Sequence, residues 1–453
     1  MTDEYKGPEE KSLRRVLGLP ATLTIGLGVM IGSGIFVFPG LAGGRAGIGA
    51  AISFGLAGLV ALIVALCMAE LATAIPRSGG AYYFISRGLG AFWGTMVGLS
   101  LWIGLIFATG FYLVAFGYYV VDLLARFDIV SEWTDSLPLC LAAAGSILLT
   151  GINMMGASKA GKLQKSVVIL LIVIIAGFLS VGLLKSLGIA GELPVSREMP
   201  NNWTSAVLAT SALIFTSYLG FAQIANVSGE VKKPQKNLPL ALGGSVLIAA
   251  AIYVITMVVI TGAFTISQLE DMGEMAMVEL GRTLFGAAGS MVLLFAGLLA
   301  TISSANASIL GSSRILYALG RDNMVPRFTT RISSRFAVPW ISLLMVGGPV
   351  LLVLVLFDLE LLAQVASLLH LIMYALVCIS LAVLRRTNPK YYTPSFRIPF
   401  YLPLSAAGAV GCFTIIFFMS SKAQLVGAVL IFASIIWFSL YASGEQTRRS
   451  RNK

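Results

Sequence analysis

Two polar interruptions of long apolar runs carry the residues best suited to bind a small ligand. The first run reads GLGVMIGSGIFVFPG over 26–40, with Gly32, Ser33 and Gly34 near its middle. A glycine inside a helix costs about 1 kcal/mol relative to alanine, so this run favours local unwinding. Unwinding frees N–H groups for a carboxylate and carbonyl oxygens for a cation. Close helix packing through small residues explains the same pattern equally well.

The second interruption reads FTSYLGF over 215–221 and is a weaker signal, because it contains one glycine after a polar pair. Its position strengthens it. The first interruption lies in the first apolar run, and the second lies in the sixth. Two five-helix units, each opening on a broken helix, would form an inverted repeat with the binding site between the breaks.

The composition places these runs in a membrane protein. Hydrophobic residues make up 57% of the 453 positions and charged residues 11%. The mean hydropathy is +0.90. So few charges cannot cover the surface of a soluble protein of this size. One histidine and four cysteines inside apolar runs favour neither a metal centre nor disulfides.

A helix needs roughly 20 apolar residues to cross the hydrocarbon core, and the chain offers twelve such runs. The predicted spans are 21–41, 50–69, 91–121, 137–153, 166–184, 203–228, 238–264, 284–313, 338–357, 361–384, 398–421 and 423–443. The last two are separated only by Lys422.

Basic residues predict the orientation. With both termini cytoplasmic, 25 of the 31 Lys and Arg residues fall in cytoplasmic segments. This distribution explains the pI of 9.6 by contact with membrane lipid, without a nucleic-acid partner. The chain has no GxxxxGK[ST] motif of an ATP-binding module, so any energy that the protein uses must come from a gradient.

Four segments together resemble the amino acid–polyamine–organocation superfamily. They are GVMIGSGIFVFPG (28–40), AEL with IPRSGGAY (69–71 and 75–82), YLGF with GEVKKPQKNLP (218–221 and 229–239), and SSR with YALGRD (312–314 and 317–322). The resemblance implies an all-α membrane protein of 12 transmembrane helices. It also implies a five-plus-five inverted repeat, discontinuous helices 1 and 6, and two accessory helices. The corresponding limits are a cytoplasmic tail (1–17), two repeats (18–190 and 200–386), the accessory helices (396–443) and a second tail (444–453).

The same resemblance implies a substrate site between the breaks. The amides of Ser33, Gly34 and Ile35 would hold an α-carboxylate. The α-amine would lie on backbone carbonyls, and two aromatic residues would line or gate the pocket. The carbonyls are those at Met30 and Ile31 and that of Thr216 or Leu219; the aromatic residues are Phe215 and Tyr218. Many relatives carry an acidic residue where Ala222 stands, which argues against a strongly cationic substrate, and many carry an aromatic gate where Thr216 stands.

The coupling ion is predicted from helix 8. Some relatives place a lysine in helix 5, where this chain has Leu171. Helix 8 instead resembles the sodium site of sodium-coupled relatives, which predicts one Na+ site with ligands from five residues. These are Gly28, Ile31, Ala300, Ser303 and Ser304. Serines in membrane helices also bond to their own backbone or pack helices, so this pattern has a structural alternative.

Other functions fit less well. Proton-coupled transport of amino acids or amines stays the competing alternative, although no proton carrier is identified, because Glu70 and Glu230 match structural family positions and His370 is expected to hydrogen-bond a neighbouring helix. Exchange of one amino acid for another stays open. A cation–chloride cotransporter would usually carry a large cytoplasmic domain, and a membrane enzyme would need clustered His, Asp or Glu. The sequence therefore predicts a secondary transporter of amino acids, not an enzyme, whose small-molecule substrate is neutral or of broad specificity. Neither the particular amino acid nor the oligomeric state follows from the sequence.

Overall fold

The computed structural model describes residues 15–75, 80–129, 136–156, 160–189, 193, 198–336 and 338–443. Within these ranges the chain is helical, with one isolated parallel bridge between Leu17 and Val231 as its only extended pairing. The helices are α1 (Leu19–Met30), α2 (Ser33–Ala46), α3 (Gly49–Ala74), α4 (Gly80–Leu89), α5 (Ala91–Arg126), α6 (Ser136–Met154), α7 (Ala160–Ser186), α8 (Trp203–Ile214), α9 (Ala222–Asn226), α10 (Pro234–Ala263), α11 (Ile266–Met272), α12 (Ala276–Arg321), α13 (Trp340–Leu356), α14 (Leu359–Thr387), α15 (Tyr401–Phe417) and α16 (Ser421–Trp437). Short 3-10 segments include η1 (Phe215–Phe221) and η4 (Arg327–Thr330).

Ten of these helical segments are long and apolar enough to cross a membrane. The ninth and eleventh predicted spans correspond to α13 and α15, which are shorter apolar helices of 17 residues each. The described chain is therefore an all-helical, multi-pass membrane protein, as the composition predicts. The short helix α11, which follows α10, was not predicted as an element. Its Thr265–Gln268 capping box accounts for its formation.

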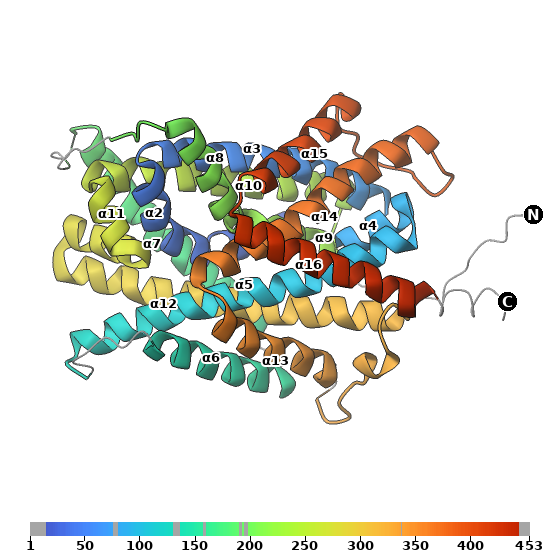
Figure 1. The fold of residues 1–453 in the computed structure, drawn as a ribbon. Helices are drawn as coiled ribbons and strands as arrows, with labels where there is room; N and C mark the ends of the chain where they lie inside the picture. Colours follow the sequence, from blue (N-terminus) through green and yellow to red (C-terminus); the bar gives the residue numbers. More distant parts are fainter. Residues whose placement is uncertain are drawn as a thin grey trace, which may run out of the picture.

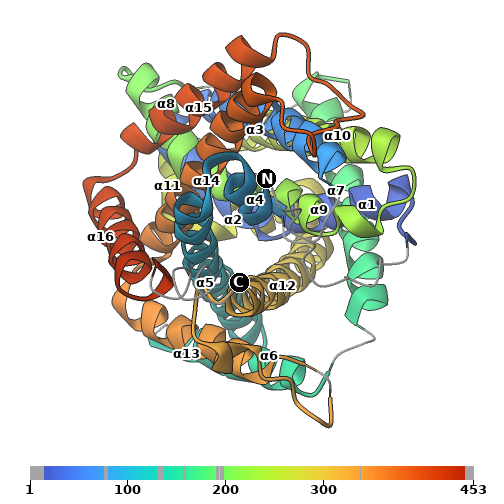
Figure 2. The same ribbon diagram turned by 90° about the vertical axis from the view of Figure 1, so that its right-hand side faces the viewer.

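The helices form an elongated bundle in which α5 and α12 run side by side along its length (Figure 1). Figure 1 places α4 and the end of α16 at one end of this bundle, and the C-terminal end of α5 at the other. Viewed from the first of these ends, α16 and α13 lie at the periphery (Figure 2). Most residues of α2 and all of η1 are buried, whereas α16 is mostly exposed. The broken segments therefore occupy the protein interior, and α16 faces the surroundings of the bundle.

The boundary between the last two predicted spans was placed wrongly at Lys422. α15 ends at Phe417 and α16 begins at Ser421, so Lys422 lies within the first turn of α16. The Ser420 side chain accepts a hydrogen bond from the Ala423 amide at 3.3 Å and caps this helix. A serine N-cap supplies the acceptor that the first-turn amides lack, and this determines where the helix starts.

Several predicted features lie outside the described residues. They include most of the first tail (1–17), the second tail (444–453) and residues 76–79 of the second family motif. The repeat limits at 18–190 and 200–386 stay predictions. At the end of the first tail, the Val16 and Leu17 amides donate to the Glu230 carbonyl at 2.9 and 3.0 Å. This pairing ties the start of α1 to the segment that follows α9.

A buried carboxylate fastens the end of α3 to the connection between α14 and α15. Glu70 is completely buried and accepts two hydrogen bonds from the Arg385 guanidinium, at 2.6 and 2.8 Å. The Tyr392 hydroxyl and the Ile398 amide donate to the same carboxylate at 2.6 and 2.7 Å. A buried charge of this kind is tolerated only when it is fully paired. Glu70 is therefore a structural residue, as its family position implies.

Candidate functional site

The first predicted interruption is a break between α1 and α2. α1 ends at Met30 and α2 begins at Ser33, so Ile31 and Gly32 lie outside regular helix. A Cβ atom at Gly32 would overlap the Ser304 hydroxyl of α12. The glycine that favours unwinding thus also allows the close approach of α12.

The second interruption is a change of helix type. The α-helix ends at Ile214, and the next seven residues, Phe215–Phe221, form the 3-10 helix η1 before α9 resumes. A 3-10 segment inside a helix alters which carbonyls are bonded and often marks a functional hinge. η1 packs against α1, so the two interruptions face each other in the protein interior.

A tyrosine from α10 links the two breaks. The Tyr253 hydroxyl is hydrogen-bonded to the Met30 carbonyl at the end of α1 and lies 3.3 Å from the Ser217 carbonyl in η1. The break at Ile31–Gly32 removes the helical partner that the Met30 carbonyl would otherwise have. The Tyr253 ring is 1% exposed and stacks on Phe54 with a centroid distance of 4.8 Å. This rigid phenol therefore fixes the two backbone breaks relative to each other.

Helix α14 holds η1 from the other side. The Thr216 hydroxyl donates to the Ala363 carbonyl at 2.7 Å and contacts the Ser367 hydroxyl. The Tyr374 hydroxyl lies 3.4 Å from the Leu219 carbonyl. Thr216 thus bonds to α14 where many relatives carry an aromatic gate. The Leu219 carbonyl, which was predicted as a possible ligand of the substrate α-amine, faces this tyrosine hydroxyl.

The predicted carboxylate-binding residues lie together at the start of α2. Ser33, Gly34 and Ile35 are all buried in its first turn. The Ser33 amide is 3.4 Å from the Ser304 hydroxyl, which places this turn directly beside α12. The first amides of a helix have no intrahelical acceptor and carry the positive end of its dipole. This turn is therefore suited to an anionic group.

The two predicted aromatic residues, Phe215 and Tyr218, belong to η1 and are completely buried. The Tyr218 hydroxyl donates to the Phe54 carbonyl of α3 at 2.8 Å. The Phe215 ring lies 6.0 Å from that of Tyr374, in an edge-to-face arrangement. Both rings pack against neighbouring helices in this conformation. Their role as the lining or the gate of the substrate pocket stays a prediction.

Most of the predicted sodium ligands also cluster at the first break. The Gly28 carbonyl oxygen and the Ser304 hydroxyl both lie within 3.4 Å of the position that a Gly32 Cβ would occupy. The Ser303 hydroxyl is buried without a hydrogen-bond partner in the described chain. Ala300 is completely buried one turn earlier on α12, and Ile31 is the C-cap of α1. The Ser304 hydroxyl and the Gly28 carbonyl oxygen are the kind of oxygen donors that a hard cation binds.

Sequence reasoning missed three residues of this site: Tyr253, Ser367 and Tyr374. Each is polar within an apolar span, and a buried tyrosine hydroxyl usually has a hydrogen-bond partner. That requirement was a usable signal. The expectation for His370 was wrong in one respect, because its Nδ1 lies 2.8 Å from the Ala366 carbonyl of its own helix.

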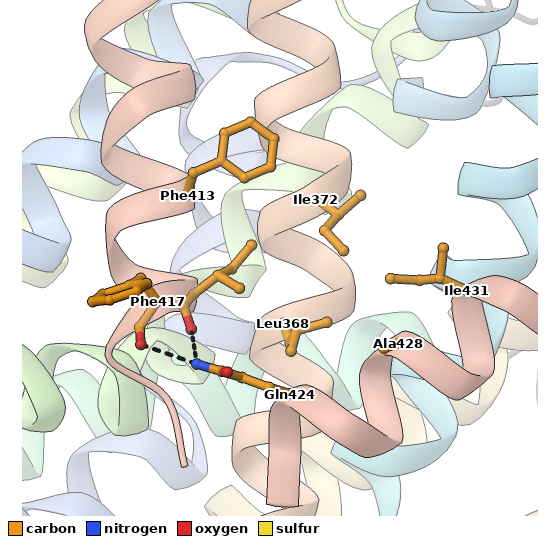
Figure 3. A pocket seen from close by; sticks show the side chains of 8 residues that line it. Leu368, Ile372, Phe413, Phe417, Gln424, Ala428 and Ile431 are labelled. Carbon is orange, nitrogen blue, oxygen red and sulfur yellow. Dashed lines mark hydrogen bonds between the residues drawn. The ribbon is translucent and has the colours of Figure 1, made fainter. Parts of the chain in front are cut away.

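A separate pocket of about 330 Å³ lies between α14, α15 and α16 (Figure 3). Its walls are apolar apart from Gln424, and the Gln424 amide donates to the Ile416 and Phe417 carbonyls at 3.0 and 2.9 Å. This amide caps the end of α15. The pocket therefore presents nothing that would recognise the charged main chain of an amino acid, and it is not the candidate site.

The chain matches the model of the family "Amino acid permease" over residues 17–440. It belongs to this family. The serine/threonine exchanger SteT of Bacillus subtilis is 25% identical over 90% of this chain and 92% of its own length. The branched-chain amino acid permease BcaP of Lactococcus lactis is 28% identical over 97% of both chains. The human cationic amino acid transporter 4 is 28% identical over 83% of this chain and 60% of its own length.

Membership confirms the superfamily resemblance that four sequence motifs indicated. It also agrees with the expectation of a permease. In the described part of the chain, no group of three or more His, Cys, Asp or Glu side chains could hold a metal ion. The chemistry available at the breaks is therefore that of amides, carbonyls and hydroxyls.

Proposed function

We propose that this permease carries neutral α-amino acids across the cell membrane by alternating access, with the main chain of the substrate held between the two helix breaks. The observation that carries this proposal is the Tyr253 hydroxyl, which joins the Met30 and Ser217 carbonyls. It brings acceptors for an ammonium group beside the α2 amides, which would hold the carboxylate. Each carbonyl has a second lone pair, so an ammonium group and a tyrosine can share it.

The uncharged lining supports a neutral side chain. The residues of the site are glycine, serine, threonine, tyrosine, phenylalanine and aliphatic residues, and Ala222 stands where many relatives have an acid. A buried cationic side chain without a carboxylate partner would be strongly disfavoured. Two of the relatives are named for serine and threonine or for branched-chain amino acids. A third is named for cationic amino acids, so lysine is the necessary comparison.

The test is uptake of labelled serine, leucine and lysine into proteoliposomes. We expect uptake of a neutral amino acid that Gly34→Leu abolishes, because a Cβ there would lie 2.7 Å from the Ser217 hydroxyl and 2.9 Å from that of Tyr253. Gly32→Leu should have the same effect. Gly177→Leu is the matched control, since a Cβ at Gly177 meets nothing within 4 Å. Normal uptake by correctly inserted Gly34→Leu protein would place the site elsewhere, and uptake of lysine alone would refute a neutral substrate.

Sodium is the proposed coupling ion, with oxygen ligands from Gly28, Ile31, Ala300, Ser303 and Ser304. The unpartnered Ser303 hydroxyl supports this assignment. Ser303→Ala should remove sodium dependence without unfolding the protein. Wild-type uptake that is equal in sodium and in potassium would refute sodium coupling and leave substrate transport intact.

Exchange is the second candidate, favoured by the similarity to a serine/threonine exchanger. An exchanger needs substrate on both sides of the membrane. Uptake that requires preloaded amino acid and ignores the sodium gradient would select this mechanism.

The proposed orientation has both termini in the cytoplasm of a multi-pass protein in the cell membrane. The bias of 25 of 31 basic residues supports it. It is consistent with Figure 1, where α4 and the end of α16 lie at the same end of the bundle. The proposed mechanism treats 18–190 and 200–386 as the two inverted repeats, with 396–443 as accessory helices.

A further inference from the structure

A second groove lies on the outside of the bundle, remote from the helix breaks. It has a volume of about 250 Å³ and is bounded by α5, α12, α13, α16 and the η4 segment. α13 and α16 both pack against α5, and Figure 2 shows them on the same side of it. This volume is below the roughly 300 Å³ of the smallest pockets that hold drug-sized ligands. The groove is therefore better suited to part of a flexible chain than to a whole compact ligand.

The walls of this groove are almost entirely hydrocarbon. They include Trp102, Met345, Ala433 and Trp437. The Trp437 indole N–H donates to the Met324 carbonyl at 2.9 Å, and the hydroxyls of Thr329 and Ser434 also bond to backbone carbonyls. An apolar occupant would therefore leave these groups satisfied.

One polar group of the lining remains unused. The Trp102 indole nitrogen is buried and has no hydrogen-bond partner among the described residues. An indole N–H can only donate, so its partner must be an acceptor. An ester carbonyl at the head of an acyl chain would supply that acceptor once the indole ring turns toward the groove, since the nitrogen itself is covered in this conformation.

The rim of the groove is basic. Arg327 is exposed and lies between two lining residues, Pro326 and Phe328. Its Nε donates to the Asn323 side chain at 2.6 Å, which fixes the guanidinium in place. A planar guanidinium is well suited to a phosphate group. Arg331 is also exposed one turn later. The groove thus combines an apolar slot with an anion-binding edge.

The position of the groove along the bundle also fits a lipid with an anionic head group. The groove lies near the end of α16 and beside the connection between α12 and α13, which the proposed orientation places at the cytoplasmic surface. Trp437 and Trp340 are 37% and 36% exposed there, as expected for aromatic residues at a membrane interface. The cytoplasmic leaflet is where anionic lipids attract basic residues.

We propose that this groove binds one acyl chain of an anionic phospholipid, with the lipid phosphate on Arg327. The bound lipid fills the space between α13 and α16 against α5. The proposal does not depend on which substrate the protein carries, and its test involves no transport.

The probe is a phospholipid with a brominated acyl chain, which quenches tryptophan fluorescence on contact. Protein is reconstituted with brominated phosphatidylglycerol or brominated phosphatidylcholine at equal mole fraction. Two of the six tryptophans, Trp102 and Trp437, line the groove. We expect stronger quenching by phosphatidylglycerol, with a preference that falls roughly fivefold in Arg327→Gln because one basic contact to anionic lipid is lost. Arg282→Gln, which changes an arginine at the opposite end of the bundle, is the control.

A second variant fills the groove itself. Ala433→Phe should reduce quenching by both lipids, because Ala433 is exposed and can accept a larger side chain pointing into the slot. Val429→Phe, at an exposed position of the same helix outside the lining, should not. Equal quenching by the two lipids in wild-type protein would overturn the role of Arg327. Unchanged quenching in Ala433→Phe would overturn the groove as the binding site.

Discussion

The Tyr253 hydroxyl offers the sharpest test of how the two breaks work together. Tyr253→Phe removes one oxygen and keeps the ring, which stacks on Phe54 and lies edge-on to Tyr218 at 5.4 Å. The change leaves the Met30 and Ser217 carbonyls without this donor. A buried acceptor left unsatisfied costs about 1–3 kcal/mol.

If the hydroxyl holds the breaks in their substrate-binding geometry, that cost appears in transport. We expect kcat/KM for uptake to fall by roughly five- to 150-fold, since each 1.4 kcal/mol is about a factor of ten. The assay is initial uptake rate against substrate concentration in proteoliposomes. Tyr119→Phe is the matched control, because Tyr119 is also fully buried and donates to the Glu274 carbonyl at 3.0 Å, away from the breaks. Equal kinetics for wild-type and Tyr253→Phe protein would refute the reasoning.

Three further predictions concern stability. Glu70→Gln leaves Arg385 without its buried partner and should destabilise the protein by about 3 kcal/mol. Glu360→Gln, in the pair of Arg45 (43% exposed) and Glu360 (32% exposed), should cost less than about 1 kcal/mol. Equal shifts of the melting temperature for the two variants would contradict this. Burial and the Glu70 carboxylate raise the pKa of Tyr392 above its ordinary value of 10.0. The neutral phenol therefore makes its full contribution to the free energy of unfolding below pH 10.0, and this contribution is lost only as the pH rises beyond that value. The difference in melting temperature between wild-type and Tyr392→Phe protein should therefore stay constant from about pH 6 to 9, and a steady decline over that range would count against it. Thr216→Val should lose the bond to Ala363 and lower the melting temperature. Thr24→Val, which loses an exposed hydrogen bond within its own helix, should not, and identical melting curves for the two variants would exclude the proposed fastening of η1.

The sequence predicted the membrane fold because the bilayer imposes a simple rule on each span. Twelve apolar runs were expected, and the part of the chain that the structure describes contains ten long segments and two shorter apolar helices at those places. The broken first span was visible because Gly32 and Gly34 interrupt an otherwise continuous apolar run. The η1 break was harder to see, because a 3-10 stretch needs no glycine pair and depends on bonds to α14 that are distant in sequence.

The rest of the site depends on packing that local sequence does not encode. Tyr253 lies 223 positions from Met30 along the chain, so only the folded bundle brings its hydroxyl to that carbonyl. The cap at Ser420 shows the opposite case, where a short-range signal was present but hydropathy alone placed the helix boundary two residues too late. Long-range pairs therefore needed the structure, whereas the cap could have been found from sequence.

The most direct test of the central claim is substrate protection at the first break. Ser33→Cys, in protein whose four native cysteines are replaced, places a thiol in the first turn of α2. A thiol reagent should label this position more slowly when a transported neutral amino acid is present, with half-protection near the KM for uptake. A labelling rate that the amino acid does not change, in protein that still transports it, would show that the substrate does not bind between the two helix breaks.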